Sequence, residues 1–137
     1  MANFGKTFFA LCLGGLLWAG SGLFTAGAAQ DSGLAMLSDL RKGEWTVRFR
    51  DGTPESKICV RSGIELLQLR HSGQSCSRFV IDDTSSQVTV QYTCRGNGYG
   101  RTNIRMETPA LVQIESQGIV DGLPFEFTSE ARHTGAC

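Results

Sequence analysis

Apolar and polar residues alternate along several short segments of the chain. In residues 44–50 (EWTVRFR) the apolar side chains fall on every second position, and residues 110–116 (ALVQIES) and 125–132 (FEFTSEAR) repeat this period. A period of two is typical of strands that bury one face. Turn-forming stretches such as DGTP and VDGLP separate the segments. About seven such strands predict an all-β, mainly antiparallel fold, either a curved meander sheet or a partial barrel.

Two further segments have helical spacing. Residues 33–43 carry leucines at helical intervals and end on a glycine, which predicts one short helix. A second short helix is expected over residues 62–73, because Ser62 and Glu65 have the spacing of a capping box. We expect both helices to pack on the sheet.

The first 29 residues have the pattern of a secretory signal peptide. Lys6 precedes an apolar stretch over residues 7–24, and small residues then match a signal-peptidase site. A transmembrane anchor is the rival interpretation, since about 18 apolar residues suffice for a span. The stretch is glycine-rich and is followed at once by the cleavage pattern, so we expect cleavage. The prediction is a single domain over residues 30–137 in the periplasm, with no stable membrane span.

The charge of the exported part is nearly balanced. Removal of Lys6 from the 13 basic residues leaves 12, against 13 acidic ones, for a net charge near −1. This balance gives no electrostatic reason to expect binding to nucleic acid or to an anionic membrane surface.

Four cysteines follow the signal: Cys59, Cys76, Cys94 and Cys137. An even number in an exported chain predicts two disulfides, and four cysteines allow three pairings. Residues 76–94 have the pattern of a hairpin, in which Val80 opposite Val90 would place the two flanking cysteines opposite each other. This register favours Cys76–Cys94, which leaves Cys59–Cys137 and ties down the end of the chain.

Catalytic and cofactor motifs are weak or absent in the sequence. The RGNGYG stretch precedes a strand pattern, whereas a phosphate-binding loop precedes a helix. His71 and His133 lack the paired C-x-x-C spacing of a zinc site, and we expect them at the surface. No G-x-S-x-G elbow occurs. We therefore expect a protein that is not an enzyme and holds no metal or other cofactor.

Two groups of residues are candidates for binding. A row of apolar residues on alternating positions is more aromatic than a thin sheet needs and could bind a small apolar ligand or an envelope component. It comprises Trp45, Phe49, Val90, Phe125 and Phe127. A basic patch flanked by tyrosines could bind an anionic glycan or an acidic partner. It comprises Arg95, Arg101 and Arg105, near Tyr92 and Tyr99.

The order of these motifs resembles a family of small exported bacterial proteins defined only as a domain of unknown function. That family opens with Gly-x-Trp, matched by Gly43 and Trp45, and ends in Arg-x-x-Gly-x-Cys, matched by Arg132, Gly135 and Cys137. The resemblance implies a periplasmic location and a β-rich fold, and no activity.

A shorter resemblance concerns VQYTCRGNG, which is similar to the Tyr-x-Cys strand of periplasmic inhibitors of c-type lysozyme. It implies an alternative function as a protein-interaction module, acting through the turns at 96–100 or 121–124. The later loop that those inhibitors use on the enzyme is not recognisable in this chain.

Overall fold

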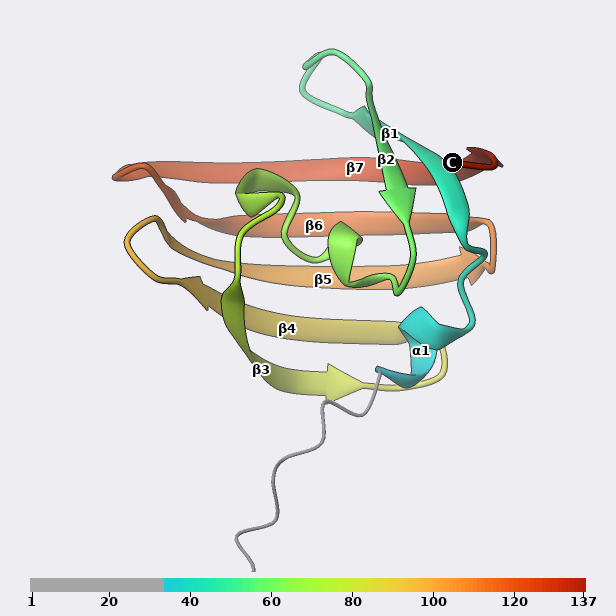
Figure 1. The fold of residues 1–137 in the computed structure, drawn as a ribbon, viewed down its shortest axis with the longest axis horizontal. Coiled ribbons are helices and arrows are strands. Elements are labelled where there is room, and N and C mark those ends of the chain that lie inside the picture. The colour runs from blue at the N-terminus through green and yellow to red at the C-terminus, as the bar shows by residue number, and fades with distance from the viewer. Residues whose placement is uncertain (1–33) are drawn as a thin grey trace, which may run out of the picture. The chain divides into compact units, whose positions relative to one another are not determined.

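The alternating segments form seven strands, which the computed structural model describes within residues 34–137 (Figure 1). In chain order they are β1 (Gly43–Phe49), β2 (Ser56–Val60), β3 (Cys76–Asp83), β4 (Gln87–Cys94), β5 (Gly98–Thr108), β6 (Leu111–Val120) and β7 (Leu123–Gly135). Every neighbouring pair is antiparallel. The predicted all-β, antiparallel class is confirmed.

The strand order in the sheet is β2-β1-β7-β6-β5-β4-β3. Strands β3 to β7 form a meander, because each pairs with the next along the chain, and β7 then returns to pair with β1. Figure 1 shows β3 to β7 running side by side, whereas β1 and β2 run steeply across them. Strands β2 and β3 remain as the two edges, so the sheet is curved and does not close.

One face of the sheet carries the hydrophobic core. Helix α1 (Ala35–Ser38) and two 3-10 turns, η1 (Ile64–Leu66) and η2 (Leu69–His71), supply buried side chains to the same core. The largest apolar side chains that this core buries fully are Trp45, Met36, Leu66, Leu67, Ile104 and Ile114. The opposite face of the sheet, which we call the outer face, carries the polar half of each alternating pattern.

The helix predicted over residues 33–43 is shorter than expected, because tertiary contacts draw the chain out of the helix after α1. The backbone N–H of Arg41 donates to the carbonyl of Pro109 over 2.8 Å. The carbonyl of Arg41 accepts a hydrogen bond from the indole N–H of Trp45, also over 2.8 Å. These partners take the place of the bonds that a longer helix would make.

The second predicted helix, over residues 62–73, is wrong in type and is replaced by η1 and η2. The predicted capping contact does form, since the Glu65 carboxylate accepts from the backbone N–H of Arg61 and of Ser62. Gly63, however, has a φ of 87°, a left-handed conformation that an α-helix cannot continue through. The contact therefore starts a tight turn instead.

Both predicted disulfides form. In the β3–β4 hairpin Val80 pairs with Val90 and Cys76 pairs with Cys94, as the register predicted. Cys59 on β2 is bonded to Cys137, with the Cα atoms 5.6 Å apart. Strand β1 lies between β2 and β7, so this bond joins the strands on either side of β1. The two bonds are compatible with an extracellular or periplasmic protein.

The expected signal peptide over residues 1–29 lies outside the described residues. Within residues 34–137, no helix has the length and apolar character needed to cross a membrane.

Candidate functional site

The apolar row proposed as a ligand face lies in the core. Trp45, Val90 and Phe127 are buried, and Phe49 and Phe125 are half-buried and pack against the same core. The rings also contact one another, since Phe49 meets Phe127 edge-on with centroids 5.3 Å apart and Phe125 stacks on Phe127. The row therefore fills the space between the sheet and its covering segments. An apolar ligand on this face stays a prediction.

His71 is fully buried, against the expectation of a surface position. Its Nε2 lies 3.0 Å from the carbonyl oxygen of Asn97, and its Nδ1 lies 3.1 Å from the Tyr92 hydroxyl. A carbonyl only accepts, so Nε2 carries the hydrogen and Nδ1 accepts from the hydroxyl. A Cβ on Gly100 would collide with the Tyr92 ring, so the glycine makes room for this contact. The imidazole thus ties η2 to the sheet.

The structure separates the residues of the predicted basic patch. Arg101 and Tyr99 are exposed together on the outer face of β5, where both line one hollow. Arg105 lies on the same face four residues further on and is paired with Glu107 over 3.3 Å. Arg95 lies in the β4–β5 turn, and Tyr92 points into the core. Arg101 with Tyr99 is the part of the patch that the fold brings together at a cavity.

Antiparallel register places outward side chains of β4 to β7 in rows across the sheet. In one row Gln91 is opposite Arg101, Arg101 is opposite Gln117, and Gln117 is opposite Glu126. A second row runs alongside it. Its members are Thr89, Asn103, Glu115 and Thr128. Directly opposed side chains in a sheet are about 5 Å apart at Cβ, so eight hydrogen-bonding groups form a continuous surface.

Two adjoining hollows lie over these rows. They measure about 440 and 570 Å³ and have Arg101, Gln117 and Glu126 in common. We call them together the outer groove. The first is lined mainly by the second row with Gln87, and the second extends to Tyr99 and Pro124. Volumes of this size match those of small-ligand sites in proteins.

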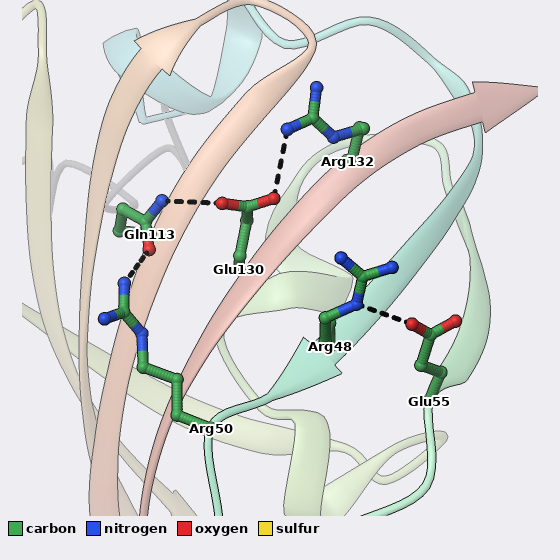
Figure 2. A network of polar contacts seen from close by, with 6 residues as sticks. All are labelled: Arg48, Arg50, Glu55, Gln113, Glu130 and Arg132. Carbon is green, nitrogen blue, oxygen red and sulfur yellow. Dashed lines mark hydrogen bonds and ion pairs between the residues drawn. The ribbon is translucent and has the colours of Figure 1, made fainter. Parts of the chain in front are cut away.

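The polar side chains beside the outer groove satisfy one another. Figure 2 shows the network over β1, β6 and β7, in which Glu130 accepts from Arg132 over 3.1 Å and from Gln113 over 3.3 Å. Gln113 in turn accepts from Arg50 over 2.9 Å, and Arg48 pairs with Glu55. The hydrogen bond from Arg132, with that from Gln113, lowers the pKa of Glu130. This part of the outer face is internally paired.

The central row of the outer groove is different. In the described part of the chain, no side-chain hydrogen bond or ion pair joins Arg101, Gln117 or Glu126 to another residue. Of the neighbouring row, Asn103 donates to Thr89 over 2.8 Å. The same sheet face therefore has a paired zone and an unpaired zone. A hollow of about 250 Å³ lies over the paired side chains of Arg48, Glu55 and Glu130, and the two larger hollows lie over the unpaired zone.

The outer groove contains two carboxylates, Glu115 on β6 and Glu126 on β7. They are diagonal neighbours in the register, positions about 7–8 Å apart. Both are exposed, whereas a glycosidase holds its acid in an apolar pocket. Within residues 34–137 no group of three or more His, Cys, Asp or Glu side chains is placed to hold a metal ion. The arrangement offers hydrogen bonds to a ligand.

Sequence reasoning identified Arg101 and Tyr99 and missed the other residues of the outer groove. Gln91, Gln117 and Glu126 occupy outward positions of separate strands, and only the register of three strand pairs brings them together. Each of them lies on the polar side of an alternating pattern, which indicates the outer face of the sheet. Many solvated residues share that property, so it does not single out a binding site.

Comparisons with protein-family models, with curated protein sequences and with solved structures found no significant match to this chain.

Proposed function

We propose that this chain is a non-catalytic binding domain of the bacterial envelope that holds an envelope component in its outer groove. The observation that carries the proposal is the contrast within one sheet face. The polar side chains over β1, β6 and β7 pair with one another (Figure 2), whereas Arg101, Gln117 and Glu126 line a hollow with no partner in the described chain. Unpaired groups converging on a hollow are a feature of ligand sites.

Export supports the envelope as the place of action. The signal-peptide pattern of residues 1–29 directs the chain out of the cytoplasm, and the two disulfides suit an oxidising compartment. A binding role is favoured over catalysis because the groove offers donors and acceptors but no nucleophile held by a base.

Retention by envelope material tests the proposal. The purified, disulfide-bonded protein is mixed with the insoluble envelope fraction of a Gram-negative bacterium and sedimented. We expect the wild type to sediment and the double variant Arg101→Ala/Gln117→Ala to bind about tenfold more weakly, since each lost hydrogen bond contributes about 0.5–1.5 kcal/mol or more when charged.

Arg105→Ala is the matched control, because Arg105 lies on the same face of the same strand but outside the lining of both hollows. It should sediment like the wild type. A wild type that stays in the supernatant, or a double variant that sediments as well as the wild type, would contradict the proposal.

A second candidate function is supported by one end of the sheet. The β4–β5 and β6–β7 turns meet there, since the backbone N–H of Asp121 donates to the Asn97 side chain over 3.0 Å. Leu123, beside this contact, is 69% exposed. These are the turns expected to act in a periplasmic inhibitor of c-type lysozyme, and an exposed leucine on a joined pair of turns suits contact with a protein.

A lysozyme assay decides this second candidate. An inhibitor at micromolar concentration should slow the lysis of bacterial cell walls by c-type lysozyme, and Leu123→Ser should weaken the inhibition. Unchanged lysis in the presence of the wild-type protein rejects the candidate. The outer-groove variant Arg101→Ala/Gln117→Ala should inhibit lysozyme as well as the wild type does.

A further inference from the structure

Resting on the proposed function, we propose that the ligand of the outer groove is a neutral, linear saccharide, bound as a segment of about three to four sugar rings. The structure supports this class through the position of the groove in the sheet, the mixture of charges in its lining, its exposed tyrosine and its dimensions.

The position of the groove argues against an extended peptide. Strands β5 and β6 are each paired on both sides, so their backbone N–H and C=O groups are already used. A peptide that binds by strand addition needs a free edge, and the edges of this sheet are β2 and β3. Recognition at the groove must therefore come from side chains alone.

The lining favours hydroxyl groups as partners. Arg101 only donates, Glu115 and Glu126 as carboxylates only accept, and Gln91 and Gln117 do both. A hydroxyl can donate to a carboxylate and accept from a guanidinium, so a ligand rich in hydroxyls can serve all of these groups.

The charges of the lining disfavour an anionic ligand. One arginine, Arg101, stands against two carboxylates, Glu115 and Glu126, so the lining carries a net charge of −1. This differs from the anionic glycan expected from the basic patch, because Arg95 and Arg105 lie outside the groove lining. Like charges across an interface cost binding energy, which leaves neutral sugars as the better match.

Tyr99 supplies an apolar surface at one end of the groove. Its side chain is 49% exposed, on the same face as Arg101. The face of a pyranose ring presents C–H groups and its rim presents hydroxyls. An exposed aromatic ring with planar polar side chains beside it is complementary to that pattern, because tyrosine has an apolar body and a polar tip.

The size of the groove sets the length of the segment. Strands β4 to β7 span three inter-strand gaps, each about 4.8 Å, or about 14 Å in all. One ring of a linear glycan advances its chain by a similar length to one such gap. About three to four rings therefore fill the groove.

Calorimetric titration of the disulfide-bonded protein tests the inference with defined saccharides. The neutral probes are cellulose and chitin oligomers of two to six rings, and the anionic probe is a hexamer of galacturonic acid. We expect at least one neutral hexamer to bind, to bind more tightly than the anionic hexamer, and to lose about tenfold in affinity when shortened from four rings to two.

Three variants connect the binding to the groove. Tyr99→Ser and Arg101→Ala should each weaken binding of the neutral hexamer about tenfold, whereas Arg105→Ala should change it by less than about twofold. An equal loss in Arg105→Ala would show that the binding does not depend on the groove lining in particular and would overturn the inference, as would tighter binding of the anionic hexamer.

The outcomes separate this inference from the proposed function. If the protein sediments with envelope material in a manner that depends on Arg101 and Gln117 but binds no neutral hexamer, the saccharide class is wrong and the binding role stands. If neither experiment shows binding, both fail. Release of shorter saccharides during the titration would contradict the non-catalytic role.

Discussion

Removal of the Cys59–Cys137 bond should be the most destabilising change that can be made without altering the core. The bond closes a loop with a sequence separation of 78 residues. Chain-entropy estimates assign about 4.5 kcal/mol to a loop of that length. Cys59 is half-buried and Cys137 is exposed, so serine at both positions adds no hydroxyl to the core. The loss is large against the about 5–15 kcal/mol that typical domains possess.

Urea unfolding of Cys59→Ser/Cys137→Ser against the wild type measures this loss. The comparator is Cys76→Ala/Cys94→Ala, which opens a loop of separation 18, worth roughly 3 kcal/mol. Alanine is used there because Cys94 is 2% exposed and serine would bury an unpaired hydroxyl. If Cys59→Ser/Cys137→Ser unfolds at the same urea concentration as the wild type, the Cys59–Cys137 bond does not stabilise the fold by reducing the conformational entropy of the unfolded chain.

Two further predictions concern the buried contact between His71 and Tyr92. Tyr92→Phe removes the hydroxyl that donates to Nδ1 and should lower the free energy of unfolding by about 1–3 kcal/mol, because a buried acceptor is left unpaired; urea unfolding at neutral pH that matches the wild type would contradict this. Burial raises the pKa of Tyr92 to about 12. The folded pKa exceeds the unfolded one of about 10. The contribution of the protonated Tyr92 hydroxyl to the free energy of unfolding is therefore complete below pH 10 and is lost as the pH rises towards 12. Between pH 10 and 12 the free energy of unfolding should fall less in Tyr92→Phe than in the wild type. Equal decreases would show that ionisation of Tyr92 is not the cause.

Most of the fold could be predicted from the sequence because each strand has only two faces. The alternation in residues 44–50 and 110–116 assigns the buried face, and a register error of one residue would expose it. The same constraint placed Cys76 opposite Cys94. The helical segments could not be bounded in this way, because their ends depend on distant partners such as the Pro109 carbonyl, which binds the backbone of Arg41.

The Gly-x-Trp motif at the start of β1 and the Arg-x-x-Gly-x-Cys motif at the end of the chain lie next to each other in the structure. Gly43 approaches Gly135 so closely that a Cβ on Gly43 would strike the Gly135 carbonyl, and Gly43 has a φ of 138°. Trp45 packs edge-on against His133 at 6.0 Å. Gly43 and Trp45 at the start of the motif pattern, and Gly135 and His133 at its end, are thus contact points between β1 and β7.

The candidate site was far less predictable than the fold. Aromatic residues on alternating positions suggested a ligand face, but the same pattern describes a core, and α1, η1 and η2 complete that core. The outer groove depends on which polar side chains find partners. Glu130 is hydrogen-bonded to Arg132 and Gln113. Glu126, four residues earlier on the same strand, has no such partner in the described chain. One partner, Arg132, is local, since it lies two residues after Glu130 on the same strand. The other, Gln113, is brought opposite Glu130 only by the register of β6 with β7, which the sequence of either strand alone does not give.

The most direct test of the outer groove as the binding site is the map of amide chemical shifts in isotope-labelled protein during titration with a neutral hexasaccharide. The account predicts that the shifts centre on the outer face of β4 to β7, at Tyr99, Arg101, Gln117 and Glu126. Shifts confined to α1 and the 3-10 turns, shifts confined to the joined turns at Asn97 and Asp121, or an unchanged spectrum would contradict it.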